Sequence, residues 1–89
     1  MHSYNTSENL DKILSKLFKK DKQLYEQIFG KIREIVNSES IESYKNLKYN
    51  MKDSKRVHIG HFVLVFSYDK KSDFVSFETF KHHDDIYKR

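Results

Sequence analysis

The stretch His61-Phe62-Val63-Leu64-Val65-Phe66-Ser67-Tyr68 is rich in β-branched and aromatic residues. That composition predicts a strand buried at the centre of a sheet. Gly60 marks a turn before it, and the polar residues 69–73 form the next hairpin loop. Further strands are expected at 56–59, where apolar and polar residues alternate, and at 74–80. The C-terminal half is therefore predicted to be an antiparallel meander.

Two helices are expected before these strands. Apolar residues recur with helical spacing over residues 10–18 and again over residues 24–36. The segment Asn5-Thr6-Ser7-Glu8 supplies side-chain oxygens for the start of the first helix, where Asn5 and Glu8 have the spacing of a capping box, and Asp21 can cap the second helix. The predicted fold class is α+β, with an N-terminal antiparallel helix pair packed on one face of a small, mainly antiparallel β-sheet. The expected core faces of the two helices are Leu10, Ile13, Leu14, Leu17 and Phe18, and Leu24, Tyr25, Ile28, Phe29, Ile32, Ile35 and Val36.

Residues 37–54 join the helices to the strands and show neither the helical nor the strand spacing of apolar residues. Serine and asparagine alternate there with lysine, which indicates a basic connector that could include a short helix or turn. Three apolar side chains are candidates to anchor it to the core: Tyr44, Leu47 and Met51. A short edge strand through Ser3 and Tyr4 is also expected. With no repeat or linker visible, residues 1–89 are predicted to form a single domain.

The composition limits the possible functions. Seventeen Lys and Arg residues against 13 Asp and Glu residues give a formal net charge of +4, which favours an anionic partner such as nucleic acid or an acidic protein segment. The absence of cysteine excludes disulfides and thiolate metal sites. No apolar run approaches the ~20 residues that cross a bilayer, so no membrane association and a cytoplasmic location are expected. The adjacent His82 and His83 point apart on an extended segment, so neither a metal nor another cofactor is expected.

The residues that could carry chemistry gather near the C-terminus. The chain ends on Lys81-His82-His83-Asp84-Asp85-Ile86-Tyr87-Lys88-Arg89, which supplies proton-transfer and phosphate-binding groups. Arg56 and His58 share one side of their strand, opposite Val57 and Ile59. If the helices cover only one face of the sheet, the other face would carry Arg56, His58, Lys81, His83 and Tyr87.

Such a cationic and aromatic surface suits single-stranded RNA, which offers phosphates for charge pairing and bases for stacking. The simpler alternative is a solvated polar tail and strand cations without a function, with the Tyr87 ring packed against the sheet. In the RNA interpretation, contacts are expected from cations and imidazoles of the connector, the first strand and the terminal segment: Lys45, Lys48, Lys52, Lys55, His58 and His82.

The segment from Arg56 to Asp69 and the terminal segment from Lys81 to Tyr87, with two N-terminal helices and a basic connector, resemble the RelE/ParE toxin superfamily, and its archaeal RelE branch in particular. The resemblance implies the toxin of a type II toxin-antitoxin system that cleaves messenger RNA on the ribosome. It also implies a cognate RelB-like antitoxin that forms a hetero-oligomer with the toxin. ParE members inhibit DNA gyrase instead, so a gyrase inhibitor or a catalytically degenerate binding module is the alternative.

The resemblance also implies roles for single residues. Arg56 and Lys81 match cations that contact messenger RNA and the scissile phosphate, His83 falls where relatives place a cation or a proton-transfer histidine, and Tyr87 matches a catalytic tyrosine. The implied reaction is metal-independent attack of a ribose 2′-hydroxyl on the adjacent phosphate, with His83 moving the proton. One position departs from the pattern, because many RelE toxins have an arginine where this chain has Val63.

Overall fold

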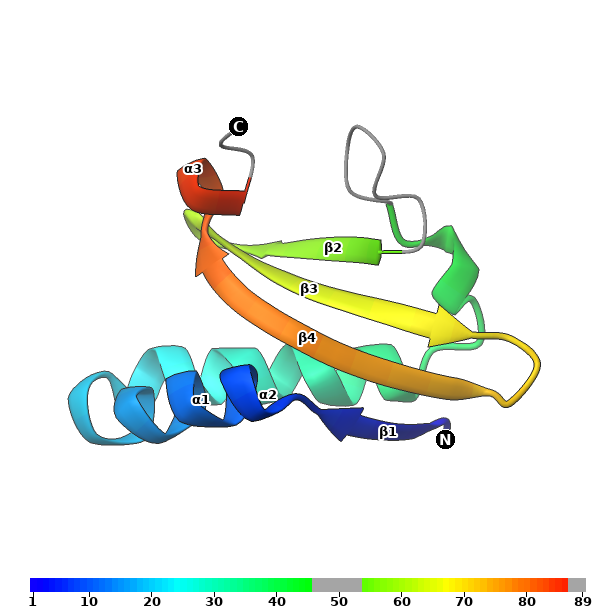
Figure 1. Ribbon diagram of the computed structural model, residues 1–89, viewed down its shortest axis with the longest axis horizontal. Helices are drawn as coiled ribbons and strands as arrows, with labels where there is room; N and C mark the ends of the chain where they lie inside the picture. The colour runs from blue at the N-terminus through cyan, green and yellow to red at the C-terminus, as the bar shows by residue number, and fades with distance from the viewer. Residues whose placement is uncertain (46–53, 87–89) are drawn as a thin grey trace.

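The computed structural model describes residues 1–45 and 54–86. The elements follow in the order β1 (Ser3–Thr6), α1 (Glu8–Lys20), α2 (Lys22–Val36), a 3₁₀ turn η1 (Ile41–Ser43), β2 (Ser54–Ile59), β3 (Phe62–Asp69), β4 (Phe74–His82) and α3 (His83–Ile86). Figure 1 shows α1 and α2 on one side of the curved strands and the short α3 on the other side, where β4 ends. The predicted α+β fold, a helix pair on one face of the sheet, is confirmed. In the described part of the chain, no helix is both long and apolar enough to cross a membrane.

The sheet has four strands in the order β1-β4-β3-β2. β2, β3 and β4 form the predicted antiparallel meander. The turn between β2 and β3 has two residues, and Gly60 adopts a φ of 61° there, a left-handed conformation that glycine adopts without a steric penalty. The predicted N-terminal strand is present and pairs in parallel with β4, from Ser3 opposite Phe74 to Thr6 opposite Phe77.

The caps of the two helices were partly predicted. Asp21 caps α2, because its Oδ1 accepts a hydrogen bond from the amide of Leu24 at 3.1 Å. For α1, the predicted segment contains the cap, but the capping box of Asn5 with Glu8 was wrong. Ser7 caps this helix, since its Oγ accepts from the amide of Leu10 at 3.0 Å. Asn5 is unavailable as a cap because it lies within β1, where it pairs with Ser76.

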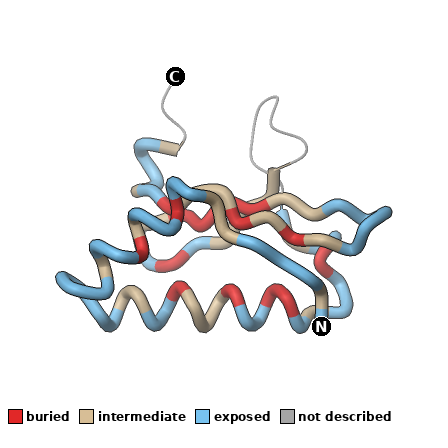
Figure 2. Tube along the Cα trace, turned by 60° about the horizontal axis from the view of Figure 1, so that its bottom comes forward, coloured by how far each residue is buried: buried red, intermediate tan, exposed pale blue. Residues whose placement is uncertain are grey.

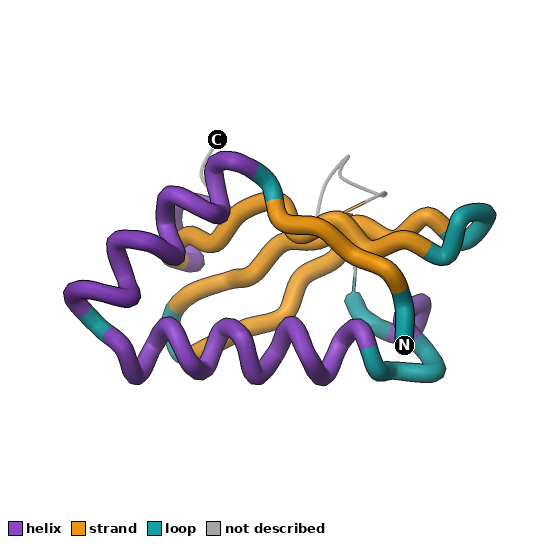
Figure 3. Tube along the Cα trace, turned by 90° about the horizontal axis from the view of Figure 1, so that it is seen from below, coloured by secondary structure: helices purple, strands orange, loops and turns teal. Residues whose placement is uncertain are grey.

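The main core lies between the helix pair and the sheet. Figure 2 shows buried positions recurring along α2 on the side that faces the strands, and Figure 3 shows α1 and α2 diverging from their turn across one side of the sheet. Phe18 was expected in this core, but it is 51% exposed and its ring packs edge-on against Tyr25 instead. The buried members of this cluster are Leu10, Leu14, Ile28, Ile32, Ile35, Val36, Ile41, Ile59, Leu64, Phe66, Val75, Phe77 and Phe80.

The first part of the connector is attached to this core. Ile41, in η1, is 2% exposed, although the sequence pattern did not single it out. Tyr44, one of the predicted anchors, packs its ring edge-on against Phe66 with 5.6 Å between centroids. The amide of Arg56 donates to the carbonyl of Lys45 at 2.9 Å, which holds the connector beside β2. The other candidate anchors, Leu47 and Met51, lie outside the described residues.

Candidate active site

The face of the sheet turned away from α1 and α2, called here the outer face, carries the candidate site. Because side chains alternate along a strand, residues on either side of Val57 in β2 and of Leu64 in β3 point to this face. Strand pairing then sets two rows across β2, β3 and β4. The rows are His58, Val63 and Lys81, and Arg56, Val65 and Thr79.

A small apolar cluster holds α3 against the outer face. Val63 is 0% exposed and Val65 is 3% exposed, and Ile86 of α3 packs against both. The amide of His83 donates to the carbonyl of His61 at 2.8 Å, which ties the start of α3 to the β2–β3 turn. Figure 1 shows α3 folded back over the end of the sheet where β2 and β3 meet. This docking brings the first residue of α3 to the side chains of β2.

The residue brought there is His83. Its ring stacks on the ring of His58, with 5.5 Å between centroids and 28° between planes. The guanidinium Nη1 of Arg56 lies 3.3 Å from Nδ1 of His58. Since a guanidinium only donates hydrogen bonds, Nδ1 accepts, and the proton of a neutral His58 ring is on Nε2.

The surroundings of His58 favour its neutral form. Partial burial lowers the pKa of His58, and the positive charges of Arg56 and of protonated His83 lower it further. His58 can therefore accept a proton at a pH where an ordinary imidazole is already partly charged.

Arg56 is half-buried and incompletely paired. Its Nε is buried and has no hydrogen-bond partner among the described residues. A buried donor without a partner is unusual in a folded protein and calls for an explanation such as a ligand that binds there. Lys81 is a second cation on this face, in the row of His58 but on β4, so that β3 separates it from Arg56 and His58.

The structure separates two other candidates from this group. Lys55 points to the helix side of the sheet, where its Nζ donates to the carbonyls of Glu42 at 3.3 Å and Tyr44 at 3.2 Å. His82 also lies on the helix side, with its ring 5.5 Å from the ring of Phe62.

The remaining candidates lie in the connector and at the C-terminus. Lys45 is exposed at the end of the described connector. Lys48, Lys52 and Tyr87 lie outside the described residues.

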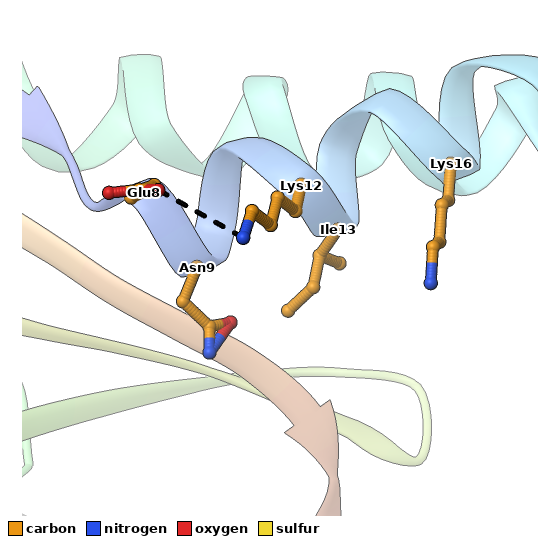
Figure 4. A pocket seen from close by; sticks show the side chains of 5 residues that line it. All are labelled: Glu8, Asn9, Lys12, Ile13 and Lys16. Carbon is orange, nitrogen blue, oxygen red and sulfur yellow. Dashed lines mark ion pairs between the residues drawn. The ribbon is translucent and has the colours of Figure 1, made fainter.

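A shallow hollow between β2 and α2 includes one candidate residue, because His58 lines it together with Gln27, Gly30, Lys31, Glu34, Ile59 and Gly60. Another shallow hollow lies along α1, on the helix layer, lined by Glu8, Asn9, Lys12, Ile13 and Lys16. Figure 4 shows Lys12 turned back to its ion pair with Glu8, at 3.9 Å, and Asn9 pointing toward β4. This hollow contains none of the candidate site residues. Among residues 1–45 and 54–86, no group of three or more His, Cys, Asp or Glu side chains could hold a metal ion.

Sequence comparisons identify two similar archaeal proteins. A protein of Methanocaldococcus jannaschii named "Putative toxin RelE4" is 44% identical over 90 residues, which cover 100% of this chain and 94% of the relative. An uncharacterized protein of Methanosarcina mazei is 47% identical over 88 residues, which cover 98% of this chain and all of the relative. No protein-family model matches the chain.

Comparisons with solved structures give the same fold. The match to the RelBE2 toxin-antitoxin complex of Mycobacterium tuberculosis has a TM-score of 0.73 at 14% identity and covers 91% of this chain and 96% of that one. The isolated RelE toxin of E. coli matches with a TM-score of 0.71 at 21% identity, over 92% of this chain and 84% of that one. YafQ of E. coli matches with a TM-score of 0.69 at 14% identity, over 98% and 99%.

The structural matches have low sequence identity and establish the fold, whereas the archaeal relative matches the whole chain at 44% identity. Together with the helix pair, the meander and the terminal segment folded back on the outer face, this similarity establishes that the chain belongs to the RelE branch of the RelE/ParE toxin superfamily.

Proposed function

We propose that this protein is the toxin of a type II toxin-antitoxin system and that it cleaves messenger RNA on the ribosome at the outer face. The observation that carries the proposal is the assembly of Arg56, His58 and His83, from β2 and α3, beside Lys81 of β4. These residues combine cations for a phosphate with imidazoles for proton transfer.

The cations fit a phosphate that gains charge during the reaction. Nε of Arg56 is buried, so a rotation of the side chain would have to turn it outward, and it could then donate to a phosphate oxygen without losing a hydrogen bond within the described residues. Lys81 lies across β3 from His58, with Val63 between them. In this proposal, Lys81 on the neighbouring strand takes the place of the arginine that is missing at Val63. Cations at these positions stabilise the charge that develops on the phosphorane oxygens.

The stacked imidazoles fit the two proton transfers. With its lowered pKa, His58 accepts the proton of the ribose 2′-hydroxyl through Nδ1 once the phosphate takes over the guanidinium of Arg56. His83, in the same stack, protonates the departing 5′ oxygen. The 2′ oxygen forms the new bond to phosphorus as the bond to the 5′ oxygen breaks. The products are a 2′,3′-cyclic phosphate and a 5′-hydroxyl, and Tyr87 stacks on a base or joins the proton transfer.

A toxin with this activity in the cytoplasm needs an inhibitor. The matched M. tuberculosis structure is a toxin-antitoxin complex, and RelE and YafQ of E. coli have also been solved in complexes named RelBE and DinJ-YafQ. By analogy, this chain binds a cognate RelB-like antitoxin in a hetero-oligomer. Acidic side chains of that partner would pair with Arg56 and Lys81.

The deciding experiment is cleavage of messenger RNA on purified archaeal ribosomes, with the 5′ ends mapped. Wild-type protein is expected to cut within translated codons, whereas His58→Ala and His83→Ala cut at least tenfold more slowly. Supercoiling by purified gyrase, measured in parallel, is expected to be unaffected. Intact messenger RNA with inhibited gyrase would replace this proposal by the ParE-like alternative, and intact messenger RNA with normal supercoiling would favour a degenerate binding module.

A further inference from the structure

The pairing of β3 with β4 contains an irregularity beside the candidate site. Val65 faces Thr79, but the next residue, Phe66, faces Phe77, so Glu78 is an extra residue of β4 without a partner on β3. This β-bulge lies next to the row that contains Arg56. Bulges next to active sites commonly redirect a side chain.

The bulge is held in place by the start of α1. The amide of Ser7 donates to the carbonyl of Phe77 at 2.9 Å, and Oγ of Ser7 donates to the carbonyl of Glu78 at 2.5 Å. Ser7 is also the cap of α1, so the helix layer fixes the backbone at the bulge. The direction of the Glu78 side chain is therefore built into the fold.

The Glu78 side chain reaches across the outer face. Its Oε1 lies 3.5 Å from Oγ of Ser54, although Ser54 is on β2 and Glu78 is on β4. The carboxylate therefore lies over β3, on the face that carries Arg56. The distance is at the upper limit of a hydrogen bond, so the carboxylate keeps most of its capacity to accept hydrogen bonds.

The carboxylate is half-buried and makes no ion pair within 4.0 Å among the described residues. It therefore does not neutralise Arg56 or Lys81, and on its own it repels the phosphates that those cations attract. Its chemistry suits hydrogen-bond donors of the RNA, which include the N–H groups of the bases.

We propose that Glu78 is a specificity-determining residue that reads a guanine on the RNA, an inference that rests on the proposed function of the outer face. Guanine presents two neighbouring donors, N1–H and N2–H, which match the two oxygens of a carboxylate. Uracil has one N–H between two carbonyl oxygens, which repel a carboxylate. Adenine and cytosine place an acceptor nitrogen beside the amino group, so they offer the carboxylate one hydrogen bond.

The test uses fluorescence anisotropy with 2′-O-methyl pentanucleotides, which cannot be cleaved: UUGUU, UUAUU and UUUUU. Wild-type protein is expected to bind the guanine probe roughly tenfold more tightly than the adenine probe. Glu78→Gln presents one acceptor and one donor, and adenine, guanine and uracil each offer a neighbouring donor and acceptor that match them, so the preference for guanine is expected to be lost. Glu8→Gln removes the same charge from α1 and is expected to keep the wild-type preference.

Three results would contradict the role of Glu78 in guanine recognition. A Glu78→Gln protein that keeps the guanine preference, or a wild-type protein that binds all three probes equally or none of them, would overturn it. The same variants on programmed ribosomes separate it from the proposed function. Guanine-selective binding without any cleavage refutes only the cleavage proposal, whereas cleavage whose base preference is unchanged in Glu78→Gln refutes only the role of Glu78.

Discussion

The two faces of the sheet differ in what they contain, although the same three strands build both. The helix side carries most of the buried side chains, among them Leu64, Phe66 and Phe77, each 0% exposed. Among residues 1–45 and 54–86, the outer face buries only Val63 and Val65 under Ile86, surrounded by charged groups and imidazoles. Because side chains alternate along a strand, residues that stabilise the core lie next to residues of the candidate site in the sequence. Substitution of one residue is therefore expected to change stability, and substitution of its neighbour to change activity.

The largest expected effect is on the helix side. Phe66→Ala should lower the free energy of unfolding by about 4 kcal/mol, because it removes a fully buried ring and leaves a cavity. Urea denaturation monitored by circular dichroism would measure the loss. Phe18→Ala, at a ring that is 51% exposed, is the control and should change stability far less. Equal losses for both variants would contradict the placement of the core.

On the outer face, Arg56→Ala should lower the rate of single-turnover messenger-RNA cleavage roughly a hundredfold, because a stabilising donor to the phosphate is lost. The free energy of unfolding should stay within about 0.5 kcal/mol of wild type, since the side chain of Arg56 loses only an exposed hydrogen bond to His58, at 3.3 Å, within the described residues. Lys12→Ala, an exposed cation on α1, should leave both quantities unchanged. A loss of stability without a loss of rate would assign Arg56 to the scaffold instead.

The sharpest comparison uses two adjacent residues that are both 0% exposed, Val63 and Leu64. Leu64→Ala should lower stability by about 3 kcal/mol and leave the rate of the remaining folded protein unchanged. Val63→Ala should lower the free energy of unfolding by about 1.5 kcal/mol. It should also slow cleavage up to about a hundredfold, because Ile86 loses a packing partner and α3, which includes His83, shifts away from His58. Rates corrected for the folded fraction would show the contrast. Similar corrected rates for the two variants would rule out a positioning role for Val63.

A smaller effect is expected in the pH profile. The general base must be neutral, and the pKa of His58 lies below its ordinary value of 6.5, so the acid limb of the cleavage profile should lie below pH 6.5. Arg56→Ala removes one cause of the shift and should move that limb toward higher pH, in addition to its effect on rate. Single-turnover rates between pH 4.5 and 8 would measure the acid limb of the wild type and of Arg56→Ala. An acid limb that does not move in this variant would exclude His58 as the base.

The smallest effect concerns the helix side, where His2 joins the N-terminus to the β3–β4 turn. Its ring hydrogen-bonds the Asp73 carboxylate and, at 2.7 Å, the carbonyl of Ser38, and Tyr68 donates to Asp73 at 2.8 Å. These acceptors raise the pKa of His2 above 6.5, so its stabilisation is complete below pH 6.5 and is lost as the pH rises through the raised value. The pKa of Asp73 is lowered below 3.8, and its contribution is lost only in stronger acid.

The urea midpoint of the wild type should therefore decrease slightly on the alkaline side of pH 6.5, and His2→Gln should remove that decrease. Cleavage should not respond to this variant, because His2 lies on the opposite side of the molecule from the stacked imidazoles. An unchanged pH dependence of stability in His2→Gln would show that the alkaline decrease has another origin.

Local patterns predicted most of the elements. The period of α2 and the polar cap at Asp21 depend on nearest neighbours along the chain, so they could be read from the sequence. The errors came from long-range competition. Asn5 was drawn into β1 by pairing with β4, and Phe18 was left exposed because the curved sheet does not reach that end of α1.

The candidate site was predictable only where it depends on local patterns along the chain. Alternation placed Arg56 and His58 on one face before the structure was known, but the same alternation also places Lys55 on the other side. The stack of His58 on His83 joins residues 25 positions apart and requires α3 to fold back. Glu78 gave no signal, because a bulge changes side-chain direction without changing the composition of the strand.

Composition and periods of a few residues were enough to predict the two helices, the meander, the cationic balance and the residue types available for RNA chemistry. The folded chain was needed to learn which strand β1 joins, which side chains meet on the outer face, and how Ser7 directs Glu78 across it. Those contacts join residues that are distant along the chain, so their geometry is set by packing, which local sequence does not encode.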